Sequence, residues 1–190
     1  MEDSMTKTPS NMMPLGTKAP DFYLLDTISG TKKSLLELKS DIATVIMFIC
    51  NHCPFVKHVR DKLINLANDY TPKGISFIAI SANDASEYPE DAPDKMKDIA
   101  QQFGYPFPYL YDESQKTAKA YGAACTPDFY IFDNDLRCVY RGQFDSSRPE
   151  SNVPVTGEDM RSALDDILSE KPISVRQRPS LGCNIKWKHQ

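Results

Sequence analysis

The sequence predicts an α/β fold in which helices flank a central mixed β-sheet. Two apolar runs, residues 44–49 and 75–80, lack polar alternation and are typical of strands buried on both faces. The apolar stripe between them predicts a helix, so the three segments predict a right-handed strand, crossover helix and parallel strand. A hairpin pattern at residues 128–140 adds an antiparallel pair. The 190 residues, 41% of them hydrophobic, fit one domain of this class.

Residues 1–15 are expected to form a flexible arm. Neither helical nor alternating periodicity occurs before Pro20. Residues 22–25 then predict a short strand, and Ser34 is a candidate N-cap for a brief helix through Leu38. Ordered structure is therefore expected to begin close to residue 20.

The long helix that follows the first apolar run is expected to begin at Pro54, which suits a first helical position. Gly74 is expected to end it. Its apolar residues recur at intervals of three and four and form one stripe, made of Val56, Val59, Leu63, Leu66, Ala67 and Tyr70. This stripe is expected to pack on the sheet.

The second half of the chain alternates helices and strands. Residues 83–94 predict an acidic, solvated loop, and a helix ended by Gly104 follows it. Residues 109–111 predict a strand and residues 114–121 a short helix. The hairpin comes next, and a last helix begins near Thr156. The helix before Gly104 is expected to face the sheet with Met96, Ile99, Ala100 and Phe103, and the last helix with Met160, Leu164, Ile167 and Leu168.

Residues 171–190 differ in composition from the domain before them. This C-terminal tail carries five basic residues and no acid, together with Cys183 and the only tryptophan, Trp187. Its composition is typical of a disordered segment, although Ile185 and Trp187 are able to dock on the domain.

Charge and hydropathy exclude several classes of function. Lysines and arginines number 22 against 26 acidic residues, so there is no basic field to hold nucleic acid or an anionic membrane. The longest apolar run is far shorter than a membrane-spanning helix, and the N-terminus has no apolar core for secretion. We therefore expect a soluble, cytoplasmic protein. Five cysteines in such a chain favour catalytic, metal-binding or inert thiols over structural disulfides.

The segment Ile49-Cys-Asn-His-Cys-Pro54 places two cysteines where a buried strand leads into the long helix. The partial positive charge of a helix N-terminus favours a thiolate and lowers a cysteine pKa. His52, Lys57 and Arg60 would add positive charge there. Two other interpretations remain: the cysteines pack at the strand end, or the C-x-x-C pair binds a metal. The position favours redox chemistry.

Residues 16–26 contain Ala-Pro-Asp-Phe-Tyr-Leu, and Cys53-Pro-Phe-Val-Lys57 opens the helix. In these segments the chain resembles the thioredoxin-like superfamily, and more closely its AhpC/TSA (redoxin, peroxiredoxin-like) branch, from Gly16 to the helix ending near Ser169. The resemblance implies a thioredoxin-like fold for a domain at residues 16–170, with an N-terminal extension and the basic C-terminal tail.

The resemblance permits two alignments of the cysteines. In the first, Cys50 and Cys53 match the thioredoxin C-x-x-C, so Cys50 attacks and Cys53 resolves. In the second, the helix and Lys57 are aligned, Cys53 attacks, and Val56 replaces the second cysteine. The second needs no gap as far as Tyr70 and places Cys53 on the Cys-Pro of peroxiredoxins. It therefore assigns Cys53 as the nucleophile.

A second matching segment is Cys125-Thr-Pro-Asp-Phe129, just before the hairpin. The resemblance implies a cis proline at Pro127 that faces the cysteine loop, with the backbone of Thr126 free to pair with an extended peptide or hold a mixed disulfide. An ordinary trans bond is the alternative. Cys125 would then lie close to the active loop, either as an inert buried thiol or as a third redox thiol.

Two further thiols lie outside the matching motifs. Cys183 is interpreted either as a resolving thiol, in cis or in trans, or as a free surface thiol on a mobile arm. Cys138, in the middle of a predicted strand, is interpreted as a packing residue.

The function these features predict is thiol-disulfide exchange. Cys53 would attack a protein or small-molecule disulfide, and Cys50, Cys125 or Cys183 would resolve the intermediate, with electrons from a cellular dithiol. No cofactor is required. Natural substrate and oligomeric state stay open.

Two alternatives are kept. A thiol peroxidase would reduce hydroperoxides and act as an antioxidant through a sulfenic acid on Cys53. The resemblance opposes this peroxidase interpretation, because two residues usual in peroxiredoxins are replaced. Cys50 stands in place of the usual Thr or Ser, and Pro127 stands in place of the usual arginine. Only Arg141 could compensate for the missing arginine. A soft-metal-binding module would use Cys50, Cys53, and His52 or Cys183 to hold zinc or copper(I).

Overall fold

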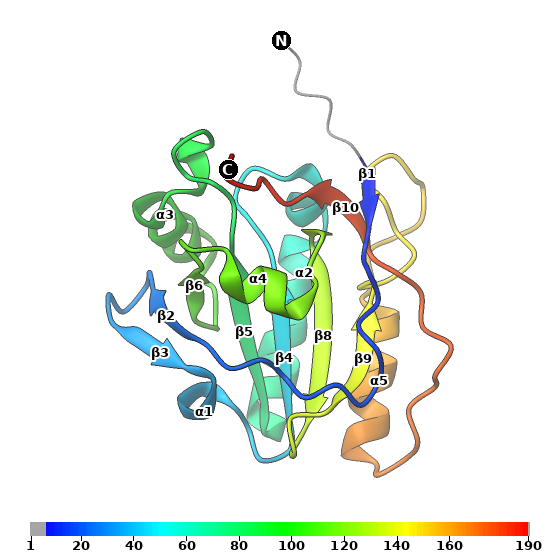
Figure 1. The fold of residues 1–190 in the computed structure, drawn as a ribbon. Helices are drawn as coiled ribbons and strands as arrows, with labels where there is room; N and C mark the ends of the chain where they lie inside the picture. The colour runs from blue at the N-terminus through cyan, green and yellow to red at the C-terminus, as the bar shows by residue number, and fades with distance from the viewer. Residues whose placement is uncertain (1–6, 190) are drawn as a thin grey trace.

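The computed structural model describes residues 7–189, and within them seven strands form one mixed sheet. The spatial order is β3-β2-β6-β5-β4-β8-β9 (Figure 1). The strands are β2 (Tyr23–Asp26), β3 (Lys32–Ser34), β4 (Ala43–Phe48), β5 (Ile75–Ser81), β6 (Tyr109–Tyr111), β8 (Asp128–Asp133) and β9 (Cys138–Gly142). Strand β5 is parallel to both of its neighbours, β4 and β6. The other neighbouring pairs in this sheet are antiparallel. The predicted mixed sheet is confirmed.

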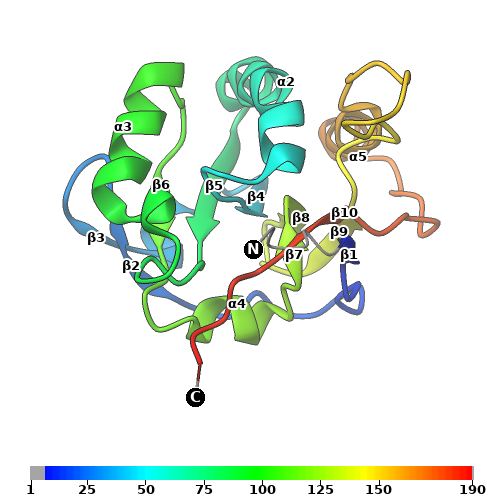
Figure 2. The same ribbon diagram turned by 90° about the horizontal axis from the view of Figure 1, so that it is seen from above.

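Helices cover both faces of this sheet. Helices α2 (Pro54–Tyr70), α3 (Pro93–Phe103) and α5 (Glu158–Leu168) pack on one face, and α1 (Leu35–Leu38) and α4 (Lys116–Tyr121) pack on the other (Figure 2). Two single-turn 3-10 helices, η1 (Thr71–Lys73) and η2 (Pro89–Asp91), follow α2 and precede α3. The predicted helices are all present, and each begins or ends within a few residues of the expected position.

Strand β4 is the centre of the core because all six of its side chains are buried. Val45 and Met47 face the side covered by α2, whereas Ile46 and Phe48 face the opposite side. The apolar stripe of α2 is buried as expected. A strand that lies between two layers of helices requires apolar side chains on both of its faces. This packing brings the end of β4 and the start of α2 to one edge of the sheet.

A second, three-stranded sheet joins the two ends of the described chain. Strand β10 (Leu181–Asn184) lies between β1 (Lys7–Pro9) and β7 (Cys125–Thr126), and both pairings are antiparallel. Figure 1 shows β1 and β10 side by side near the N-terminal end of the drawn chain. These strands have four residues or fewer, too few to show periodicity, and their partners are distant in sequence.

Two expectations about the ends of the chain are therefore corrected. Residues 7–15 of the expected flexible arm are held in place: Lys7–Pro9 pair with β10, and the Ser10 amide donates to the Ser180 carbonyl at 3.0 Å. The expected arm's residues 1–6 lie outside the described residues. The basic tail docks on the domain, where Ile185 is buried in the core and Trp187 is 37% exposed.

The expectation of a solvated loop at residues 83–94 is also wrong in part. Asn83, Asp84 and Asp91 are buried, and the Asp91 side chain is fully enclosed. The reason is that this loop leaves β5 at the edge where the neighbouring β4 ends, so its polar groups fold over the cysteine segment. None of the helices in residues 7–189 is long and apolar enough to span a bilayer.

Asp128, the first residue of β8, is fully buried, and burial raises its pKa to about 7. A carboxyl whose pKa is higher in the folded than in the unfolded state binds more protons when folded. Burial of Asp128 is therefore expected to contribute a fall in the free energy of unfolding as pH rises from about 4 to about 7, whereas the lowered pKa of Cys53 contributes a rise over the same range. Asp128→Asn should remove this fall and stabilise the protein above pH ~7 by up to about 4 kcal/mol.

Urea unfolding at several pH values measures this effect. Asp61→Asn, on the exposed side of α2, is the control and should leave the pH dependence unchanged. An Asp128→Asn curve that runs parallel to the wild-type curve would contradict the expected linkage.

Candidate redox site around Cys53

Cys53 occupies the N-cap of α2, and its side chain is completely buried. Its carbonyl oxygen accepts hydrogen bonds from the Val56 and Lys57 amides at 3.1 and 3.0 Å, which begin the helix. Pro54 fits the first helical position because it has no amide hydrogen to satisfy there. The local sequence thus places one thiol at the positive end of a helix of 17 residues.

Cys183 lies directly against Cys53. Strand β10 pairs Cys183 with Thr126, and this register brings the Sγ atoms of Cys183 and Cys53 to 2.7 Å. Cys183 is 2% exposed. The interpretation of Cys183 as a free surface thiol on a mobile arm is therefore wrong, because Cys183 lies in a paired strand of the tail and its thiol is enclosed.

The pKa of Cys53 is lowered to about 2. The largest cause is the hydrogen bond from the Cys183 thiol, and the Cys50 thiol adds a second. Burial opposes ionisation, while Thr126 and the Val56 amide favour it. The pKa of Cys183 is raised, first because its proton is held by Cys53 and then by burial. The opposite directions of these two pKa shifts favour the thiolate on Cys53 and the thiol on Cys183.

Cys50 lies near the end of β4 and is 1% exposed. Its Sγ is 3.5 Å from the Thr126 hydroxyl oxygen. Burial raises the pKa of Cys50, and its hydrogen bond to Cys53 and the charge of Asp91 raise it further. The two cysteines of the C-x-x-C segment thus have opposite pKa shifts, and the lowered one belongs to Cys53.

The Thr126–Pro127 peptide bond is cis, and the Thr126 carbonyl oxygen lies 3.2 Å from Cys53 Sγ. Cys125, which precedes it, is fully buried, and burial raises its pKa. Its Sγ points to the Pro127 carbonyl oxygen at 3.8 Å. Within the described residues, the backbone of Thr126 is already paired with β10.

Sequence reasoning missed Asp91, which holds the cysteine loop from the side of β5. Its carboxylate accepts hydrogen bonds from the amides of Asn51 (2.7 Å) and His52 (3.3 Å), and from Asn83 Nδ2 (2.8 Å). His52 Nδ1 lies 2.5 Å from Asp91 Oδ2, and the His52 ring stacks on Tyr88. A signal was available, since the acidic loop follows β5 and the ends of adjacent parallel strands share an edge.

This contact determines the charge of His52. The hydrogen bond to Asp91 raises the pKa of His52 against the effect of burial, and the negative charges of Asp91 and Cys53 raise it further. Burial disfavours ionisation of Asp91, but hydrogen bonds from His52 and Asn83 leave its pKa lowered. At a pH below the raised pKa of His52, the His52 imidazole is thus a cation next to the Cys53 thiolate.

Asp91→Asn should lower the pKa of His52 towards its ordinary value of about 6.5 and loosen the loop. Replacing a carboxylate that accepts several hydrogen bonds should destabilise the protein by about 2 kcal/mol. An NMR titration of the His52 imidazole measures the first effect, and urea unfolding the second. The control is Asp84→Asn, on the same loop, whose carboxylate accepts from Ser86 instead. An unchanged His52 pKa in Asp91→Asn would show that the carboxylate does not charge the ring.

The arrangement of possible metal ligands differs from the predicted set. Cys50, His52 and Asp91 present ligand atoms within 4.8 Å of one another. Cys53 and Cys183 are instead paired with each other, and His52 Nδ1 is used by Asp91. Zinc or copper(I) would have to displace the proton of Cys50, whose pKa is raised.

Lys57, Arg141 and Cys138 were also singled out by the sequence analysis. Lys57 is exposed on α2. Arg141, the residue that could compensate for a missing arginine, donates instead to the Met13 carbonyl at 2.7 Å and to Gln177 Oε1 at 2.8 Å. Cys138 is buried in the core on the far face of the sheet, and burial raises its pKa to about 11. The geometry supports the interpretation of Cys138 as a packing residue.

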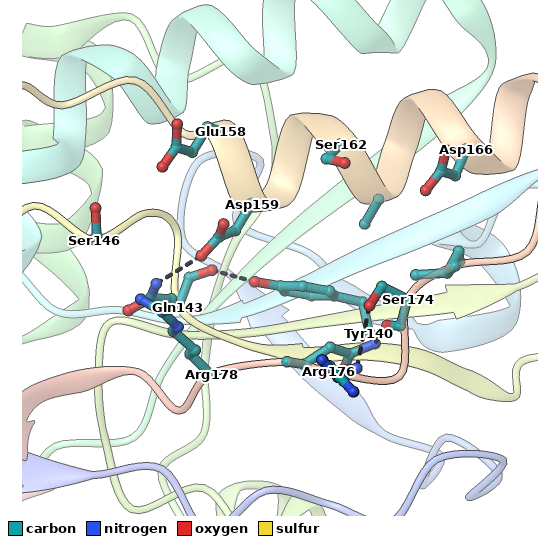
Figure 3. Close-up of a pocket in the computed structure, with 13 residues that line it drawn as sticks. Tyr140, Gln143, Ser146, Glu158, Asp159, Ser162, Asp166, Ser174, Arg176 and Arg178 are labelled. Carbon is teal, nitrogen blue, oxygen red and sulfur yellow. Dashed lines mark hydrogen bonds between the residues drawn. The ribbon is translucent and has the colours of Figure 1, made fainter.

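A pocket of about 300 Å³ lies away from the cysteines, between β9, α5 and residues 173–178 (Figure 3). The Gln143 side chain donates to Asp159 there at 2.6 Å, and the Tyr140 hydroxyl donates to the Gln143 carbonyl. The described residues that line it include no cysteine and no histidine. This pocket therefore supplies no redox group.

Fold and site together define a class: a thioredoxin-like, thiol-dependent oxidoreductase. Residues 15–141 match the AhpC/TSA family, and the chain belongs to that family. It is 27% identical over 127 residues to "Thiol-disulfide oxidoreductase ResA" of Bacillus thuringiensis (strain Al Hakam). The aligned segment covers 67% of this chain and 68% of the relative.

Solved structures resemble the chain over most or nearly all of its length. An uncharacterized conserved protein from Geobacillus kaustophilus is 62% identical, with a TM-score of 0.97 over 98% of this chain and 99% of that one. The thioredoxin domain of a thiol-disulfide oxidoreductase from Bacteroides vulgatus is 15% identical, with a TM-score of 0.60 over 79% of this chain and 97% of that domain. The latter shows a shared fold.

Proposed function

We propose that the protein exchanges thiols and disulfides, with Cys53 as the nucleophile and Cys183 as the resolving thiol. The observation that supports this assignment is the 2.7 Å separation of the two sulfur atoms. A disulfide bond requires about 2.05 Å, so only a small further approach is needed. The lowered pKa of Cys53 supports its role as the attacking thiolate.

The cycle has three exchanges. The Cys53 thiolate attacks one sulfur of a substrate disulfide, forms a mixed disulfide, and releases the other half of the substrate as a thiolate. Cys183 then attacks Cys53 Sγ and gives its proton to the departing second thiol, which leaves a Cys53–Cys183 disulfide. A cellular dithiol then reduces this disulfide with two electrons and two protons. One proton restores the Cys183 thiol, the other protonates the thiolate released in the first exchange, and Cys53 returns to its thiolate. The chemistry needs no cofactor.

The geometry favours Cys183 over the other candidate resolving thiols. The pKa values of Cys50 and Cys183 are both raised, so the sulfur–sulfur contact of 2.7 Å is what favours Cys183, whereas Cys50 Sγ also lies 3.5 Å from the Thr126 hydroxyl oxygen. Cys125 points towards the Pro127 carbonyl. Resolution by Cys183 would also assign a function to the tail, because the pairing of β10 with β7 brings the Cys183 thiol to Cys53.

A disulfide map tests the assignment. The reduced protein is oxidised with a small excess of a disulfide, quenched by acid alkylation, digested and analysed by mass spectrometry. We expect one intramolecular bond, between Cys53 and Cys183. A Cys50–Cys53 bond, or a mixed disulfide that stays unresolved, would overturn the assignment of Cys183.

Hydrogen peroxide is the second arm of the same experiment. Fast oxidation of Cys53 to a sulfenic acid would favour the peroxidase alternative. We expect slow oxidation, because Cys50 supplies a weak S–H donor where peroxiredoxins have a hydroxyl, and Arg141 is engaged elsewhere. Faster reaction with peroxide than with disulfide would replace the proposed function.

A further inference from the structure

The Thr126 edge of the site is already covered by the chain itself. Strand β10 pairs with β7 so closely that a Cβ on Gly182 would lie 2.0 Å from the Thr126 carbonyl oxygen. The end of the tail is anchored as well, since the Lys186 amide donates to Asn83 Oδ1 at 2.9 Å and its carbonyl accepts from Gln115 Nε2 at 2.9 Å. An extended peptide cannot pair with Thr126 unless β10 leaves.

On its other side the cysteine loop borders a pocket of about 630 Å³, the loop pocket. Asn51 and His52, the residues between the two cysteines, form part of its wall. The other walls come from α2, the η2 turn and α3, and Figure 2 shows α2 and α3 next to each other on one face of the sheet. This volume is in the range of small-molecule sites.

The loop pocket contains a buried guanidinium group with unused donors. Arg60 is 7% exposed, and in residues 7–189 neither its Nε nor its Nη2 has a hydrogen-bond partner. The Phe103 ring lies 4.1 Å from the guanidinium carbon. The Tyr105 side chain is hydrogen-bonded to Arg60, but two donors of this buried cation stay unpaired, which is unfavourable and points to a missing anion.

The charge and polarity of the walls narrow the choice of anion. The charge of His52 is balanced by Asp91. The other charged residues that line the loop pocket are Arg60, Lys57 and Lys95 and the acids Glu90 and Asp98, which leaves one net positive charge. That balance fits a singly charged carboxylate better than a dianionic phosphate. Pro89, Ile99 and Phe103 supply apolar surface for a short carbon chain.

We propose that the loop pocket binds the carboxylate of a low-molecular-weight disulfide through Arg60, so that the substrate of the redox site is a small anionic disulfide. The proposal rests on the proposed function, and the exchange at Cys53 is the one described there. A guanidinium donates two parallel hydrogen bonds to a carboxylate. The closed Thr126 edge and the unused donors of Arg60 both favour a small substrate over an extended polypeptide.

A series of small disulfides that differ in charge tests the kinetics. Dithiodipropionate is anionic, hydroxyethyl disulfide is neutral and cystamine is cationic, and their lengths are similar. We expect Cys53 to react with dithiodipropionate about tenfold faster than with the neutral disulfide, and slowest with cystamine. Arg60→Gln should abolish the preference, and Lys95→Glu, at the exposed rim, should reduce it. The matched control is Arg161→Gln, an arginine that lies over the Tyr70 ring outside the pocket and should keep the preference.

Binding is measured separately from reaction. Suberate has the length of dithiodipropionate with methylenes in place of both sulfurs, and it cannot exchange. We expect calorimetry to detect suberate binding to the wild type but not to Arg60→Gln, and no binding of the neutral octanediol. If Arg60→Gln fails to fold, the pocket assignment is tested with Lys95→Glu, which should bind suberate more weakly than the wild type does.

The outcomes separate the two proposals. If suberate binds but none of the disulfides reacts with Cys53, the proposed redox function fails and the pocket assignment holds. If all three disulfides react at equal rates and suberate does not bind, the pocket assignment is overturned and the redox function stands. A protein disulfide that reacts faster than dithiodipropionate would overturn the small-substrate class.

Discussion

Cys53→Ser is expected to slow reaction with disulfides by a factor on the order of 1,000 or more, because the only thiol with a lowered pKa is removed. The other cysteines have raised pKa values and give little thiolate at neutral pH. Stopped-flow measurement of thiol loss with dithiodipropionate or hydroxyethyl disulfide checks the rate.

Cys138→Ser is the matched control for this loss. Cys138 is also a buried thiol, but it packs in the core on the opposite face of the sheet. Its replacement should leave the exchange rate within about a factor of two, since it removes no group near Cys53. If Cys53→Ser kept most of the activity while Cys50→Ser lost it, the first of the two cysteine alignments would be correct.

The second large effect is expected at Cys183, where two substitutions separate two roles. Cys183→Ala removes both the hydrogen-bond donor to Cys53 and the resolving thiol. Without that donor, the pKa of Cys53 should rise by about one to two units, because a hydrogen bond to a charged group contributes about 1.5–3 kcal/mol. Cys183→Ser keeps a donor but cannot form a disulfide, so the pKa of Cys53 should stay low.

Both Cys183 variants should accumulate a mixed disulfide on Cys53 after reaction with a small disulfide. Mass spectrometry of the intact protein detects the adduct, and thiolate absorbance followed from low to neutral pH reports the pKa. The sign is fixed by the direction of the shift: Cys53 loses its thiolate as pH falls through its lowered pKa, and Cys183→Ala should lose it at a higher pH. Rapid resolution in Cys183→Ser would show that Cys50 or Cys125 resolves Cys53.

The features closest in sequence were the ones that sequence reasoning predicted well. The β4–α2–β5 unit follows from two unbroken apolar runs and one helical stripe, and the structure contains all three elements. The N-cap position of Cys53 follows from Pro54 and from the end of the apolar run, which are adjacent to it. The Ser34 cap is equally local, because Ser34 and Glu37 form a capping box within one turn.

The features that depend on distant pairing were predicted poorly. The tail looked disordered because a strand of four residues and a net positive charge give no periodic signal, yet β10 completes a sheet between β1 and β7. The buried Asp91 was read as a solvated charge because its partners, the cysteine loop and Asn83, lie on other parts of the fold. Whether an acidic side chain is buried depends on the residues that surround it in the fold, and the local amino-acid composition does not show this.

The central strand–helix–strand unit and the thiol at a helix N-terminus are encoded locally in the sequence, because apolar periodicity and helix capping act over a few residues. The three-dimensional contacts establish which thiol lies against Cys53, which carboxylate charges His52, and where two donors of Arg60 are buried without partners. These depend on contacts between segments up to 130 residues apart, whose pairing is selected by the free energy of the whole fold.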